Sequence, residues 1–194
     1  MIIPKFGTKT DHSGLGHKDN LSGVHQEILI APKNWFDTIA KPVIFPNDPT
    51  FTGTFAQMQD TVTIADDHIF KVGEGFLPLY LTFDTGAYSA EANTVYDKTG
   101  KKVSLKGFYA GNDIKTMALL ENAESYEWIV LFKFLNDLHT GGAYTQLGME
   151  GLFAKIFATF ATGTTTGDRL GYSIDIQAYI PRMYRYTGTP TLAP

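Results

Sequence analysis

The chain has 194 residues, of which 43% are hydrophobic and 19% are charged, and it contains no cysteine. This length predicts a single domain, with or without extensions, and the lack of cysteine excludes disulfides, thiolate metal sites and cysteine nucleophiles. The 16 basic and 20 acidic residues give a formal net charge of −4, which disfavours a dedicated nucleic-acid binder.

Residues 1–24 are rich in Gly, Ser, Lys and His and hold few large apolar side chains. Such a composition buries little surface, so we expect a flexible N-terminal arm followed by one domain over residues 25–194. The arm holds no signal-peptide core, and no run in the chain reaches the roughly 18 apolar residues of a membrane span. We therefore expect a protein that is made and kept in a cytosol, without membrane contact.

The domain is expected to begin with a short strand at residues 26–30. A helix of one to two turns is predicted next, capped by Asn34 and prevented from continuing by Pro42. Three prolines, repeated threonines and Gly53 then predict an extended irregular excursion over residues 41–60.

Strand patterns follow the excursion. Two strands, residues 61–64 and 69–72, are expected to form a hairpin whose tip is Asp66-Asp67-His68. Apolar and β-branched residues predict further strands at 77–83 and 103–108.

One helix interrupts the strands. Asn112 and Asp113 provide a break and a cap, and apolar residues at helical spacing predict a helix from Ile114 to about Ala123. The next run, residues 128–132, is apolar on both strand faces, so we expect it to be covered on both sides.

The clearest hairpin comprises residues 152–161 and 170–180, joined by a Gly/Thr-rich tip. Its apolar residues alternate, so one face is expected in the core. Two registers satisfy this alternation, one with Lys155 opposite Asp175 and one with Lys155 opposite Gln177. We expect the first, because opposite charges across strands are stabilising. The whole pattern predicts a mainly β (α+β) fold: an antiparallel β-sandwich or barrel with one short helix and a long C-terminal β-hairpin.

The sharpest enzymatic pattern is Leu81-Thr82-Phe83-Asp84-Thr85-Gly86-Ala87. It resembles the active-site loop of retroviral-type aspartic proteases, in which two carboxylates from two subunits share a proton. By that resemblance Asp84 is the catalytic residue. Tyr88 departs from the family pattern, and no second apolar pair with glycine follows. A strand that ends in an Asp/Gly turn accounts for the same residues, so we expect no enzyme.

Residues with metal or cofactor potential lack the required context. His12 and His17, with Asp11 and Asp19, could ligate a metal but lie in the expected arm without ordered supporting groups. Gly73-Glu74-Gly75 lacks the third glycine and the following helix of a dinucleotide fingerprint. We expect neither a metal nor a cofactor.

Aromatic residues near the hairpin invite a base-stacking interpretation, with Phe153 and Phe157 flanking Lys155. Stacking platforms normally lie in a positively charged groove, whereas Asp168 and Asp175 are close by in the sequence. Packing in the core or at a subunit interface is the better expectation.

Several segments are similar to virion proteins of phages. They are residues 23–32 leading to Trp35-Phe36, residues 108–113 leading into the helix, residues 128–132, residues 146–151, and the Gly/Thr-rich hairpin leading to Gly171-Tyr172. Over residues 23–180 the order of strands, one helix and a long hairpin resembles the tail tube proteins of long-tailed phages. The related tubes of contractile injection systems share that plan.

The resemblance implies a β-sandwich whose sheets pair between subunits in rings of six, with the rings stacked into a hollow tube. Such a homo-oligomer would explain the low charge and the 13% of aromatic residues. The arm and the 41–60 excursion would become ordered on neighbouring subunits. Candidates for the channel wall or an interface are the polar-face residues of the hairpin, namely Lys155, Thr159, Ser173, Asp175 and Gln177.

The expected function is therefore that of a structural, self-assembling virion protein, the tail tube subunit, assembled in the host cytoplasm. DNA would pass through an acidic or neutral channel without specific binding, and other tail proteins would be partners. The alternatives are another virion component, such as a capsid decoration or tail-completion protein, a protease using Asp84, or a β-sandwich binding module. An Asp84→Asn substitution separates the classes, because a protease would lose activity whereas a tube protein would still polymerise.

Overall fold

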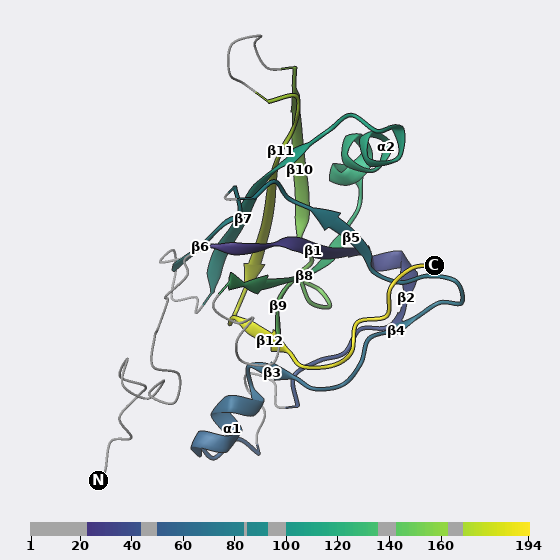
Figure 1. The fold of residues 1–194 in the computed structure, drawn as a ribbon. Coiled ribbons are helices and arrows are strands. Elements are labelled where there is room, and N and C mark those ends of the chain that lie inside the picture. Colours follow the sequence, from purple (N-terminus) through teal and green to yellow (C-terminus); the bar gives the residue numbers. More distant parts are fainter. Residues whose placement is uncertain (1–22, 44–49, 84, 93–99, 136–142, 163–168) are drawn as a thin grey trace, which may run out of the picture.

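A computed structural model of the chain describes residues 23–43, 50–83, 85–92, 100–135, 143–162 and 169–194. Within these ranges the fold is mainly β, with three sheets that are drawn in Figure 1. No sheet closes into a barrel in the described part of the chain.

The largest sheet has six strands in the order β3-β12-β9-β8-β1-β5. Its strands are β1 (Val24–Pro32), β3 (Thr63–Ile64), β5 (Leu77–Tyr80), β8 (Trp128–Phe134), β9 (Tyr144–Leu147) and β12 (Tyr184–Tyr186). Neighbouring strands are antiparallel except for β12 and β3, which are parallel. The predicted strands at 26–30, 77–83 and 128–132 are confirmed as β1, β5 and β8, although β5 is shorter than expected.

The second sheet has four antiparallel strands in the order β10-β11-β7-β6. Its strands are β6 (Ala87–Ala92), β7 (Lys101–Ala110), β10 (Lys155–Ala161) and β11 (Gly171–Ile180). Strands β10 and β11 confirm the predicted long hairpin. In Figure 1 this hairpin extends away from the six-stranded sheet, past the helix α2.

The predicted helix is confirmed as α2 (Ile114–Asn122), which continues as the 3-10 turn η2 (Ala123–Ser125). The Asp113 side chain caps it by accepting a hydrogen bond of 2.9 Å from the backbone N–H of Thr116. Hydrogen bonds from the Tyr109 hydroxyl and from Thr116 lower the pKa of Asp113 to about 2, so the cap stays ionised at neutral pH.

The expected irregular excursion over 41–60 contains a second helix. Helix α1 (Phe55–Asp60) begins at a capping box, in which Thr54 and Gln57 satisfy each other's backbone N–H groups. None of its residues is buried, and it stands off the sheets in Figure 1. The prediction of a single short helix was therefore incomplete.

The predicted helix capped by Asn34 is only the 3-10 turn η1 (Lys33–Trp35), and Asn34 lies within it. The chain then enters strand β2 (Phe36–Thr38), which pairs with β4 (Ile69–Phe70) as the third sheet. The Phe36 and Phe70 rings pack with their centroids 4.3 Å apart. Aromatic packing with a distant segment outweighs the local helix signal.

The hairpin expected over residues 61–72 is wrong. Strand β3 pairs with β12 near the C-terminus, and β4 pairs with β2. The expected tip residue His68 is only 3% exposed, so the connection is anchored in the core and does not form a solvated turn.

The hydrophobic core has two parts. In the larger part, buried side chains of the six-stranded sheet pack with those of β7, β10 and β11, and with Leu120 and Ala123. The smaller part lies on the other face of the six-stranded sheet and contains the aromatic residues Phe36, Phe76, Tyr184 and Tyr186. Strand β8 contributes alternately to both parts, as its apolar sequence predicts.

The expected register of the long hairpin is also wrong, because Lys155 pairs with Gln177 and Phe157 pairs with Asp175. The Lys155 ammonium donates to backbone carbonyls near η2. The Asp175 carboxylate accepts hydrogen bonds from Ser104 and Gln177. Lys155 and Asp175 therefore each have hydrogen-bond partners other than one another. The expected ion pair between them does not form and does not decide the register.

Candidate functional site

The five predicted channel or interface residues lie on one face of the four-stranded sheet. On β10 and β11, Lys155, Thr159, Ser173, Asp175 and Gln177 alternate with residues that pack into the core. Their common face points away from the core because side chains alternate along a strand. We call this face the outer face of the four-stranded sheet, and the core-packed face its inner face.

Charges on the outer face come close to balance. The register places Lys102 and Lys106 of β7 on it, with Glu91 of β6 opposite Lys102 and Asp175 of β11 opposite Lys106. The Asp175 carboxylate accepts hydrogen bonds of 2.7 Å from the Ser104 hydroxyl and the Gln177 amide. The described part of the face thus offers no continuous stripe of free cations that would hold phosphates.

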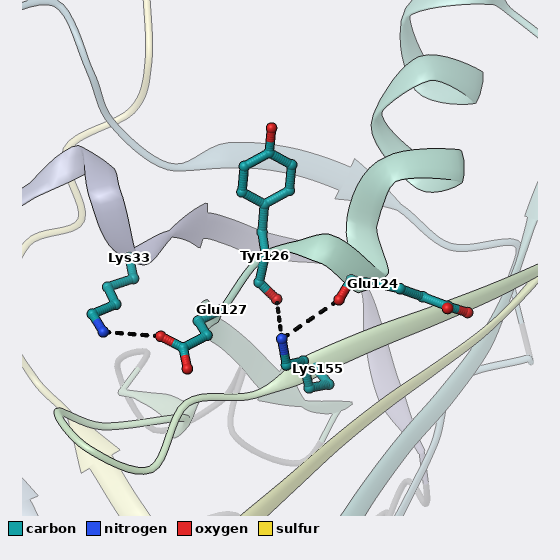
Figure 2. Close-up of polar contacts among 5 residues, drawn as sticks. All are labelled: Lys33, Glu124, Tyr126, Glu127 and Lys155. Atoms are coloured by element: carbon teal, nitrogen blue, oxygen red, sulfur yellow. Dashed lines mark hydrogen bonds and ion pairs between the residues drawn. The ribbon is translucent and has the colours of Figure 1, made fainter.

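Lys155 stands at one end of this face, where strand β10 meets η2. Its ammonium donates to the backbone carbonyls of Tyr126 at 3.1 Å and Glu124 at 3.5 Å, as Figure 2 shows. Carbonyls at the end of a helical turn lack partners within the helix, so Lys155 satisfies them from outside. Its position indicates a structural contact between the hairpin and the turn after α2.

Beside Lys155 lies an open hollow of about 360 Å³. In it the Lys33 ammonium forms an ion pair of 2.9 Å with Glu127, and both side chains are about half exposed. In Figure 2 the Glu127 carboxylate lies between Lys33 and Lys155. Lys33 donates to this carboxylate, and Lys155 donates to the Tyr126 carbonyl. This arrangement disfavours an anion site, and an exposed pair of this kind adds little stability.

The two outermost strands of the four-stranded sheet, β10 and β6, each have a partner on one side only among the described residues. Most side chains of β6 are exposed, and so are those at the far end of β10, including Phe160. Open edges present backbone N–H and C=O groups that can pair with another chain. The described part of the sheet offers such an edge along β6. Along β10 it offers one only beyond the start of the strand, because Ala154 pairs with Trp128 and Lys155 contacts the turn η2.

A cleft of about 410 Å³ opens beside β6. It is lined by Val24 and Gln26 at the start of β1, by Leu135 after β8, and by Phe83, Ala87 and Tyr88 around the start of β6. The cleft therefore lies where the open edge of the four-stranded sheet meets the six-stranded sheet.

Tyr88 is the one residue of this lining with a buried hydroxyl that lacks a hydrogen-bond partner in the described structure. Its ring packs against Phe132 and Phe134 at centroid distances of 5.3 and 5.4 Å. Burial raises the pKa of Tyr88 to about 12, so the phenol is neutral at physiological pH. The hydroxyl is enclosed, so what the cleft offers to a partner is its largely apolar lining.

The sequence pattern predicted His68 at the tip of a hairpin, whereas the structure places it in the core. Its Nδ1 accepts a hydrogen bond of 3.0 Å from the Ala40 N–H, and its Nε2 lies 3.0 Å from Gln146 Oε1. The ring stacks on Tyr186 with a centroid distance of 4.7 Å. Both nitrogens have partners within the core, which indicates a structural histidine.

Other sequence candidates fall outside the described residues, namely Asp84, His12, His17, Asp11, Asp19 and Asp168. Beside Asp84, the Thr85 hydroxyl donates to the Thr82 carbonyl and accepts from the Phe108 N–H. Thr85 thus supports the turn between β5 and β6.

Within the described ranges there is no group of three or more His, Asp and Glu side chains that could hold a metal ion. The helices of the same ranges are all too short or too polar to cross a membrane.

Comparisons of the chain with protein-family models, with curated proteins and with solved structures found no match.

Proposed function

We propose that the protein is a self-assembling structural subunit, and that it forms the tail tube of a long-tailed phage as stacked rings around a DNA channel. The proposal combines the sequence resemblance over residues 23–180 with the surfaces described above. Its main support is the four-stranded sheet, whose outermost strands β10 and β6 each have a strand partner on one side only among the described residues.

The direction of the strands allows these edges to meet. Each neighbouring pair in the order β10-β11-β7-β6 is antiparallel, so β10 and β6 run in opposite directions. When copies are related by rotation about an axis to which the strands are inclined, β6 of one copy meets β10 of the next in antiparallel orientation. Repetition would cover both edges of the four-stranded sheet without exposing a new one, which is the advantage of a closed ring.

The finer fold that we propose is a two-layer sandwich. The larger core is shared by inner-face residues of β7, β10 and β11 and by one face of the six-stranded sheet. In a ring, the outer face of the four-stranded sheet would line the channel, and the other layer would lie outside it. Three lysines and two acids on the described outer face would let DNA pass with few phosphates neutralised.

A charge placed on an open edge tests this proposal. Ala90 is an exposed inner-face residue of β6, and Ala90→Lys would place an ammonium beneath the paired edges, in the space that the next copy encloses. Ala65→Lys is the matched control, because Ala65 is exposed and follows β3, which belongs to the other sheet. Light scattering at increasing concentration should show oligomers for the wild type and for A65K, and monomers for A90K.

Two results would contradict the proposal. One is a wild-type chain that stays monomeric at every concentration reached. The other is an A90K variant that assembles as readily as A65K, because burial of an unpaired ammonium costs several kcal/mol.

A further inference from the structure

The geometry points to an aromatic insertion between copies: we propose that Phe160 of one copy enters the cleft beside Tyr88 of the next copy. The inference rests on the proposed edge pairing and specifies its register and its main apolar contact. The occupant of the cleft is thus a second copy of this chain.

The position of the cleft is the first step of the argument. Its lining includes Tyr88, an inner-face residue of the edge strand β6, together with Val24 of β1 and Leu135 after β8. A strand added to β6 would direct its inner-face side chains into the space between the layers. An inner-face side chain from a neighbouring β10 therefore reaches this cleft.

The choice of Phe160 follows from the alternation along β10. The inner-face residues of that strand are Ile156, Ala158 and Phe160. Ile156 is fully buried in the core of its own copy, and Ala158 is small. Phe160 is large and 38% exposed, so it is the inner-face residue of β10 with apolar surface left to bury.

The contact requires a defined stagger between the copies. Across the four strands of one copy, Tyr88 is in register with Leu105, Ile176 and Ile156. A neighbouring copy added without a stagger would therefore place its Ile156 opposite Tyr88. Phe160 is four positions further along β10. A closed sheet tilted by about 36° shifts its register by roughly one residue per strand, and therefore by about four residues per four-stranded copy.

Paired cysteine substitutions report this register, and the chain has no cysteine of its own. With the stagger, outer-face Ser89 of one copy lies opposite Thr159 of the next; without it, Ala87 lies opposite Phe157. An equimolar mixture of Ser89→Cys and Thr159→Cys chains should therefore form a covalent dimer on oxidation, whereas Ala87→Cys mixed with Phe157→Cys should not. Within one copy β6 and β10 are separated by two strands, about 14 Å, which is beyond the reach of a disulfide.

A truncation tests the insertion itself. Phe157 is 39% exposed on the outer face of β10, so Phe157→Ala is a matched control for Phe160→Ala. We expect F160A to raise the concentration needed for assembly by roughly 10- to 100-fold, and F157A to change it little. Circular dichroism of both variants checks that the chain remains folded.

The outcomes separate this inference from the proposed function. If the wild type assembles, but the unstaggered pair crosslinks or F160A assembles like F157A, the insertion is wrong and the edge pairing stands. If the wild type never assembles, both proposals fail. The inference is supported if only the staggered pair crosslinks and F160A alone weakens assembly.

Discussion

At the scale of single residues, the buried histidine has the clearest physical consequence. His68 uses both ring nitrogens, accepting from the Ala40 N–H and donating to the side-chain oxygen of Gln146. This assigns the neutral ring, with its proton on Nε2. Burial lowers the pKa of His68 from 6.5 to about 4, although Gln146 and Asp67 oppose that shift.

This shift predicts a pH dependence of stability. The unfolded chain binds a proton at His68 below pH 6.5, whereas the folded chain binds it only near pH 4. The free energy of unfolding should therefore be fully retained above pH 6.5 and fall as the pH drops toward 4, by about 3 kcal/mol in total. Urea denaturation across this range measures the loss.

Two glutamine variants isolate the contribution of His68. In H68Q the loss of stability between pH 6.5 and 4 should be smaller than in the wild type. H25Q is the matched control for the loss of a histidine, because His25 lies in β1 and is only half-buried. Equal pH slopes for the wild type and H68Q would contradict the assignment.

At the scale of elements, the hairpin strand β11 begins where the backbone of β7 approaches closely. An added Cβ at Gly171 would lie 2.0 Å from the Tyr109 carbonyl oxygen. That overlap is with backbone, so neither strand can relieve it by a rotamer change. Glycine at position 171 is therefore required for the β11–β7 pairing.

Gly171→Ala should reduce the free energy of unfolding by about 3 kcal/mol, because the strands must move apart. Gly100→Ala is the matched control, since its nearest contact would be the Ile180 carbonyl at 4.0 Å, and it should change stability by less than about 0.5 kcal/mol. Chemical denaturation at a concentration that keeps one species in solution measures both values. Similar effects for the two variants would contradict the steric argument.

Elements with a strong local signal could be predicted from the sequence. The apolar run of β8, the alternation in β11 and the Asp113 cap of α2 each carry their own pattern. The pairings of β3 and β4 could not be predicted, because their partners are far away in the sequence. The register of the long hairpin failed for the same reason, since the partners of Lys155 belong to the turn after α2.

The candidate site was only partly accessible to sequence reasoning. Alternation placed the five polar hairpin residues on one face, as the structure has them. The cleft beside Tyr88 is lined by residues from β1, β6 and the end of β8. These segments are far apart in the sequence, so no local pattern predicts that they come together.

At the scale of the whole molecule, the structure shows where aromatic and other apolar side chains reach the surface. Large apolar side chains are exposed on helix α1, on the long hairpin and around the start of β6, including Met58, Phe157, Phe160 and Phe83. Two of these regions adjoin the open edges β10 and β6. Edge pairing between copies would bury this surface.

Negative-stain electron microscopy of the full-length protein at high concentration tests the central claim most directly. We expect rings, or stacked rings, around a central channel, and their absence for A90K under the same conditions. Isolated particles of single-chain size at every concentration would contradict the account.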